Sequence, residues 1–124
     1  MNKEFIKKRI QSFTLLEDDW DSYGAEAFSE CLIIGILNII DLLPDDIEIK
    51  DPWVVPGPGG VQLEWENGKK ELEIEMRENL VGCLQVDMSK EKEEDQYIET
   101  EILISSGVKN IQIKIRELLE WLVK

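Results

Sequence analysis

The sequence contains no histidine among its 124 residues. This absence excludes the Ser–His and Cys–His pairs of nucleophilic catalysis, a histidine general base and every metal site built on imidazole. Cysteine is also scarce: Cys31 and Cys83 lie far apart in the sequence, and two single thiols do not complete a zinc site. Both have apolar neighbours in the sequence, which predicts buried free thiols rather than a structural disulfide.

Long apolar runs are missing as well. The longest, Cys31 to Ile40, is interrupted by Gly35 and Asn38, and a bilayer crossing needs about 20 apolar residues. The N-terminal segment is charged but has neither the apolar core nor the small-residue cleavage site of a secretion signal. We therefore expect a reduced, cytoplasmic protein that has no contact with a membrane.

Basic residues are few and unevenly placed. The chain has 14 Lys and Arg against 27 Asp and Glu, which gives a net charge of −13. Residues 17–106 hold 24 of the acidic residues but only six of the basic ones, so an anionic middle lies between two mildly basic ends. Such a field repels nucleic acid and attracts basic proteins at raised association rates. The length and the 43% of apolar residues fit a single domain, 1–124.

Hydrophobic periodicity predicts helices towards both ends of the chain. Residues 4–16 and 108–123 place their apolar side chains at helical spacing. Ser29 is a suitable cap for a third helix, which ends at Pro44 and is apolar nearly all round. A helix with so little polar surface is typical of a domain centre or of a dimer interface.

Period-two alternation predicts four strands between these helices. They cover residues 61–66, 71–77, 80–88 and 96–105, and they are joined by the turns Asn67–Gly68 and Glu78–Asn79 and by an acidic loop at 90–95. The Pro- and Gly-rich segment 52–60 allows at most a short edge strand. The predicted fold is therefore α+β: an antiparallel four-stranded meander, with a fifth short edge strand as an option, packed on one face by two N-terminal helices and one C-terminal helix.

The same alternation predicts that one sheet face is almost wholly acidic. In residues 80–88 we expect Leu80 and Leu84 to face the helices. Val81, Cys83 and Asp87 would then point away from them. Eight carboxylates would share the outer face: Glu64, Glu66, Glu71, Glu73, Glu75, Asp87, Glu99 and Glu101.

Two main interpretations of this face remain open. It is either a solvated surface kept soluble by charge, or a surface that imitates the phosphates of a nucleic acid and docks on a basic protein groove. An oligomer contact and cation binding are further alternatives. The eight carboxylates are the candidate partner-binding residues, although like charges on neighbouring strands repel one another.

The most unusual stretch runs from Asp18 to Ala25. Its carboxylates, Asp18, Asp19 and Asp21, could bind Mg²⁺ or Ca²⁺ in a metal-assisted hydrolase, but their spacing does not match a calcium-binding loop, and we expect no metal site. The segment could instead plug one end of the core, with Gly24 at a positive φ.

Aromatic residues offer a second candidate site. Trp20, Tyr23, Trp53 and Trp65 belong either to the core or to a pocket that binds a small ligand. The candidate ligand cluster comprises Trp20, Asp21, Tyr23, Trp53 and Trp65.

Two residues of the last predicted helix lie off its main apolar stripe. Ile113 and Trp121 are eight residues apart and so share a helix face. They belong either to a wide buried stripe or to an oligomer interface. Together with the apolar helix before Pro44, they predict a homodimer through helices.

Two motifs resemble those of a group of small bacterial and prophage proteins. In that group a Trp-Asp-x-Tyr-Gly-Ala motif precedes a helix, and a Pro-x-Pro-x-Gly-Gly segment leads into a strand that ends Leu-Glu-Trp. The resemblance covers Trp20 to Met76 and implies a single cytoplasmic domain, without supplying an activity. It is carried by Trp20, Asp21, Tyr23, Gly24, Gly60, Glu64 and Trp65.

Taken together, these features predict a non-enzymatic binding protein with no catalytic residues and no cofactor. The first hypothesis is an acidic inhibitor of a basic partner, which would be a nuclease, a toxin or a nucleic-acid-handling complex. Antitoxins, immunity proteins and phage anti-defence proteins share this physical logic. We expect this protein to bind no nucleic acid directly. The alternatives are a small-ligand-binding protein that uses the aromatic cluster and a metal-assisted hydrolase.

Overall fold

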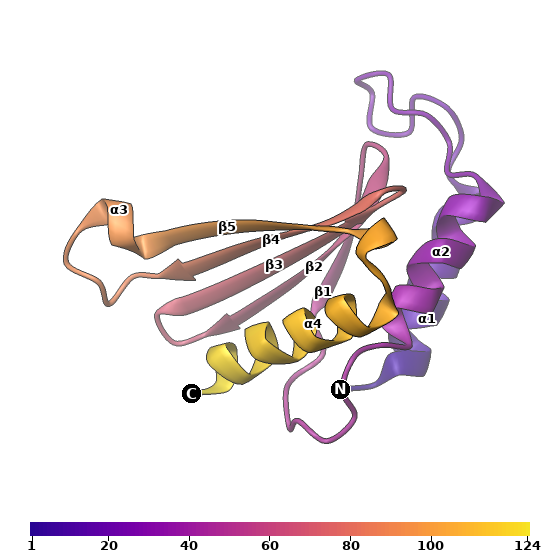
Figure 1. Ribbon diagram of the computed structural model, residues 1–124. Helices are drawn as coiled ribbons and strands as arrows, with labels where there is room; N and C mark the ends of the chain where they lie inside the picture. Colours follow the sequence, from indigo (N-terminus) through magenta and orange to yellow (C-terminus); the bar gives the residue numbers. More distant parts are fainter.

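A five-stranded antiparallel sheet is the centre of the computed structural model, which describes residues 1–124 (Figure 1). The strands follow one another in chain order, so each pairs with the next. This meander confirms the predicted α+β class, and β1 is the short edge strand that the sequence allows as an option. The strands are β1 (Trp53–Gly57), β2 (Gly60–Asn67), β3 (Lys70–Arg77), β4 (Leu80–Asp87) and β5 (Tyr97–Leu103).

The three long helices lie towards the two ends of the chain, with α4 running along the sheet and α1 and α2 packed together near one end of it (Figure 1). One short helix, α3, replaces part of the predicted acidic loop. None of the helices combines the length and the apolar composition that a bilayer crossing requires. The helices are α1 (Lys3–Ser12), α2 (Glu30–Ile40), α3 (Glu93–Gln96) and α4 (Val108–Val123), with 3-10 turns η1 (Phe13–Leu15) and η2 (Ile104–Ser106).

Helix α2 begins at the predicted cap. The Ser29 hydroxyl oxygen accepts a hydrogen bond from the Leu32 N–H at 3.1 Å, which satisfies one free donor of the first turn. Although α2 is apolar nearly all round, only one side of it faces the core. Ile36 and Ile40 are fully buried, whereas Ile34 is exposed.

The core fills the space between the helices and one face of the sheet. Burying each large apolar side chain there contributes roughly 1.5–3 kcal/mol relative to leaving it exposed. No polar or charged residue is buried, so the core depends on apolar packing alone. Its largest fully buried members are Ile6, Ile10, Ile36, Ile40, Leu63, Leu72, Ile74, Met76, Ile115, Leu118, Leu119 and Leu122.

The register of β4 differs from the sequence prediction by one residue. Val81 and Cys83 lie opposite buried residues of β3 and are themselves buried against the helices. The turn Glu78–Asn79 explains the difference, because a two-residue turn places Arg77 and Leu80 opposite each other on the outer face. Leu80 therefore faces away from the helices, contrary to the prediction.

The same shift corrects the predicted position of Asp87. It lies opposite Lys70, on the helix side of the sheet, and not on the acidic face. The Lys70 ammonium donates to the Trp121 carbonyl oxygen at 2.9 Å and lies 5.0 Å from the centre of the Trp121 ring. The positive charge of Lys70 is thus directed at α4 and does not compensate the carboxylates of the outer face.

The two cysteines have different environments. Both are free thiols, as predicted, but Cys31 is exposed at the start of α2 rather than buried. Cys83 is buried on the helix side of β4, and this burial raises the pKa of its thiol to about 11. Cys83 is therefore protonated near neutral pH and acts as a small apolar residue.

Gly60 permits a close approach between β2 and β3. A Cβ atom at this position would lie 2.6 Å from the Met76 carbonyl oxygen, a contact that the backbone would have to move to relieve. Gly35 of α2 differs, since a Cβ atom there would have no neighbour within 4 Å.

We predict that Gly60→Ala lowers the free energy of unfolding by about 2 kcal/mol, because it overpacks a rigid backbone contact. The matched substitution Gly35→Ala should raise that free energy by about 1 kcal/mol, because Ala is the better helix former. Urea unfolding followed by circular dichroism measures both. Equal effects of the two substitutions would contradict the close contact at Gly60.

Candidate functional site

The outer face of the sheet carries a dense group of carboxylates. Glu64 lies directly opposite Glu73, and Glu66 directly opposite Glu71, at positions whose Cβ atoms are typically about 5 Å apart. Arg77 is the only basic strand residue on this face, and it pairs with a neighbouring carboxylate of its own strand. The seven predicted carboxylates that the structure keeps on this face, here called the acidic face, are Glu64, Glu66, Glu71, Glu73, Glu75, Glu99 and Glu101.

Glu73 lies in the middle of the acidic face. Its pKa is raised above the usual glutamate range, first because partial burial disfavours the charged form. The neighbouring carboxylates of Glu64, Glu71 and Glu75 add repulsion in the same direction. A hydrogen bond from the Gln62 side-chain amide to Glu64 Oε1, at 2.7 Å, gives one of these carboxylates a donor. The charge on the acidic face therefore costs folding free energy.

A hollow of about 250 Å³ separates the carboxylates of β2 and β3 from those of β5. It lies over β4 where Gly82 provides no side chain, and a Cβ atom there would have a single neighbour within 4 Å. Glu73, Glu75, Glu99 and Glu101 line it. A basic side chain that entered the hollow would reach several carboxylates at once, and a guanidinium could form paired hydrogen bonds with them.

Apolar side chains flank the carboxylates on the same face. Trp53 and Val55 lie on β1, and Tyr97 and Leu103 lie on β5, all of them exposed. Trp53 is 59% exposed and lies directly opposite Glu64. Trp and Tyr are enriched in protein interfaces, where they bury large areas at low entropic cost. Sequence alternation places Tyr97 and Leu103 on the same face as Glu99 and Glu101, but it does not show which apolar side chains the edges of a sheet leave exposed.

The aspartates of residues 18–25 bind the backbone of their own loop. Each accepts hydrogen bonds from N–H groups further along the chain, and these bonds hold the pKa of Asp21 below its usual range. No three Asp, Glu or Cys side chains come together in an arrangement that could hold a metal ion. The carboxylate oxygens accept from the following backbone N–H groups: Asp18 from Ala27 (2.9 Å), Asp19 from Gly24 (2.7 Å), and Asp21 from Tyr23 (2.9 Å) and Ala25 (3.0 Å).

The predicted aromatic cluster is not assembled as one site. Trp65 is buried in the core, where its Nε1–H donates to the Lys50 carbonyl oxygen at 3.0 Å, whereas Trp53 lies on the opposite face of the sheet. The Tyr23 side chain is 93% exposed. Trp20 instead stacks on Phe28, with ring centres 5.8 Å apart, and helps to close the core behind the loop.

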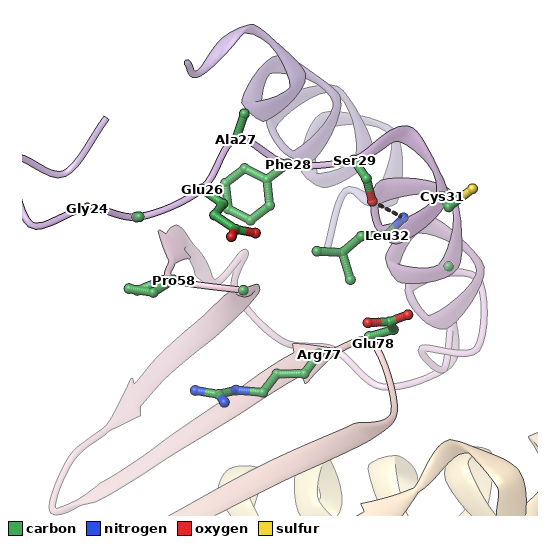
Figure 2. Close-up of a pocket in the computed structure, with 13 residues that line it drawn as sticks. Gly24, Glu26, Ala27, Phe28, Ser29, Cys31, Leu32, Pro58, Arg77 and Glu78 are labelled. Carbon is green, nitrogen blue, oxygen red and sulfur yellow. Dashed lines mark hydrogen bonds between the residues drawn. The ribbon is translucent and has the colours of Figure 1, made fainter. Parts of the chain in front are cut away.

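A larger cleft, of about 550 Å³, lies elsewhere (Figure 2). It is enclosed by residues 24–29, the start of α2 and the turns that contain Pro58 and Glu78, so it joins parts of the Trp-Asp-x-Tyr-Gly-Ala and Pro-x-Pro-x-Gly-Gly motifs. Phe28 and Leu32 contribute apolar walls, and Glu26 extends towards the space between them (Figure 2). Sequence reasoning missed this cleft, because its walls come from segments that are far apart in the chain.

The two residues predicted for an oligomer interface have separate environments. Ile113 is exposed beside a groove that also contains Leu42 and Arg116. Trp121 is partly buried against the core and contacts Lys70. A homodimer through the helices stays a prediction.

Comparison with known proteins finds no match: no family model fits the chain, and no curated protein or solved structure is significantly similar to it. The resemblance in the two motifs therefore stays a prediction. Any function of this chain has to be inferred from its own geometry and charge.

We predict that Glu73→Gln stabilises the protein near neutral pH. Because the folded state raises the pKa of Glu73 above its ordinary value of 4.5, the penalty is present above the folded pKa and disappears as the pH falls below the ordinary value. The free energy of unfolding should rise by about 0.5 kcal/mol at about pH 7 and be unchanged at about pH 4. Thermal unfolding at both pH values tests this, with Glu17→Gln in an exposed loop as the control. A gain that is independent of pH would contradict the electrostatic origin.

Proposed function

We propose that this protein is a non-enzymatic binding protein whose acidic face docks on a basic protein. The partner would be a nuclease, a toxin or a nucleic-acid-handling complex, and docking would block its nucleic-acid groove. The observation that carries the proposal is the pairing of glutamates directly opposite each other across β2 and β3. A solvated sheet face normally alternates acidic and basic partners, because like charges placed opposite each other are destabilising.

The spacing of the carboxylates supports a phosphate-like surface. Alternate residues of a strand lie about 6.7 Å apart, and neighbouring strands lie about 4.8 Å apart. Carboxylates at these spacings form a fixed two-dimensional array of negative charge on a rigid support. A groove that binds nucleic acid presents Lys and Arg to such an array, and the same groups would bind the acidic face.

The charge of the whole chain would assist the encounter. A net charge of −13 attracts a basic partner over distances comparable with the Debye length and raises the association rate. The exposed rings of Trp53 and Tyr97 would then add apolar contact at the edges of the interface. Two free thiols are compatible with action in the cytoplasm, and no cofactor enters the proposal.

One observation favours a second candidate, a small-ligand-binding protein. The cleft of about 550 Å³ has the volume of an ordinary ligand site, and parts of both motifs meet there. Its walls carry charges of both signs, Arg77 together with Glu26 and Glu78, and so do not select one class of ligand. Leu32→Lys, at the cleft, would abolish this function and leave the acidic face unchanged.

The acidic-face proposal is tested by reversing charge at Glu64, Glu73 and Glu101 together. The partner is first captured from host lysate at low and at high salt and identified. We expect the triple Glu→Lys variant to bind that partner at least about tenfold more slowly, with the loss shrinking as salt rises above about 0.15 M. Surface plasmon resonance separates the association and dissociation rates.

A matched control changes the same total charge elsewhere. Glu17, Glu48 and Glu117 are exposed and lie outside the sheet, so their joint replacement by Lys should reduce the association rate only slightly. Equal losses in the two triple variants would show that net charge alone matters. If the first triple variant binds the partner as fast as the unmodified protein at low salt, the acidic face is only a solvated surface.

A further inference from the structure

The strand β5 forms a free edge of the sheet. It is last in the strand order, and no helix or strand lies beyond it (Figure 1). All of its residues are exposed or half-buried. Proteins commonly protect such an edge with Pro, Lys, a bulge or a covering segment. The opposite edge strand, β1, contains Pro56, whereas β5 contains neither Pro nor Lys.

Hydrogen bonding shows which residues of β5 direct their backbone outward. The Ile104 N–H, just after the strand, donates to the Asn79 carbonyl oxygen at 3.0 Å. Since alternate residues of an antiparallel pair bond to the neighbouring strand, the even-numbered residues of β5 bond to β4. The odd-numbered residues direct their N–H and C=O groups away from the sheet: Tyr97, Glu99, Glu101 and Leu103.

The two faces of this edge have opposite chemistry. Glu99 and Glu101 lie on the acidic face and reach the hollow above Gly82. Ile98 is 51% exposed on the helix side of the sheet, whereas Ile102 of the same strand is partly buried against the core. The helices therefore leave the Ile98 end of β5 uncovered. A strand that joined this edge would meet negative charge on one face and apolar side chains on the other.

We propose that β5 binds an extended segment of a basic protein, which adds a strand to the sheet. The segment would carry Lys or Arg at alternate positions, beside Glu99 and Glu101. Apolar residues would occupy the intervening positions, beside Ile98, Thr100 and Ile102. Backbone hydrogen bonds would supply affinity, and the alternation would supply specificity. This inference rests on the proposed function and specifies the part of the basic partner that binds at the edge of the acidic face.

The hollow extends the same recognition. An added strand would lie about 4.8 Å beyond β5. From there, a long basic side chain of the added strand could cross β5 beside Glu101 and reach the hollow. Its guanidinium or ammonium group would enter the space lined by Glu75 and Glu99. Either group would reach it, but a guanidinium can form paired hydrogen bonds with these carboxylates, so arginine would bind there more tightly than lysine.

A second copy of the chain is a poorer occupant of this edge. Antiparallel pairing over the whole strand would place Tyr97 opposite Leu103 of the second copy. Glu99 would then lie opposite Glu101 on both sides of the two-fold axis, and two such like-charge pairs disfavour the dimer. The charge of β5 therefore selects a different, basic strand.

The test uses two synthetic peptides of equal charge and composition. One heptapeptide alternates Lys and Val, and the other has the same residues in a non-alternating order. We expect the alternating peptide to bind the full-length protein about tenfold more tightly. On binding, the amide hydrogens of Glu99 and Glu101 should become protected from exchange, while those of α4 stay unchanged.

Paired substitutions separate the edge from its charge. Glu101→Gln removes the charge and keeps the outward N–H, whereas Glu101→Pro also removes the N–H without breaking a bond to β4. We expect the proline variant to bind the alternating peptide about tenfold more weakly than the glutamine variant. If the proline variant does not fold, N-methylation of the peptide at alternate residues removes the same hydrogen bonds from the other side.

Three results would overturn the inference. They are equal binding of the two peptides, equal binding by the proline and glutamine variants, and a dimer in light scattering that the proline variant abolishes. In the first two cases the proposed function still stands if charge reversal at Glu64, Glu73 and Glu101 slows association with the captured partner. If that reversal has no effect while the alternating peptide still binds the edge, the proposed function fails and the strand site remains.

Discussion

Period-two alternation in β2 and β3 is the constraint on which the rest of the structure depends. In these strands every second residue is a large apolar side chain that packs under α4 and α2, and the geometry of a strand directs each intervening residue to the other face. Five of the eight residues that β2 and β3 direct to that face are glutamates. The same sequence pattern therefore builds the core on one side and the acidic face on the other.

Because the core lies on one side only, the outer face has little part in holding the fold together. No charged residue is buried, and cross-strand repulsion costs on the order of 1 kcal/mol per pair, which apolar packing on the helix side outweighs. The chain tolerates the carboxylates without needing them for folding. Glu73 illustrates this, since partial burial and three neighbouring carboxylates raise its pKa and no basic residue compensates. A binding role for the acidic face gives this cost a physical reason.

Much of this arrangement could be predicted from the sequence, because residues 61–66 of β2 and 71–77 of β3 alternate strictly and Ser29 caps α2 as expected. Alternation could not show which residues of β4 face the core, since both its even-numbered and its odd-numbered positions include apolar residues. Its register is set by the Glu78–Asn79 turn, and following that turn would have predicted the inward side chain of Val81. The cleft beside α2 and the separation of Trp53 from Trp65 depend on long-range packing, which no local pattern encodes.

The most direct measurement of whether the acidic face is the interaction surface is a solution NMR footprint of the complex. The isotopically labelled protein is titrated with the basic partner captured from host cells. Shifts should concentrate at the amide signals of β2, β3 and β5, with the exposed side of α4 around Gln112 unchanged. Shifts confined to residues 24–29 and the start of α2, with an unperturbed sheet, would contradict the proposed surface and favour the cleft.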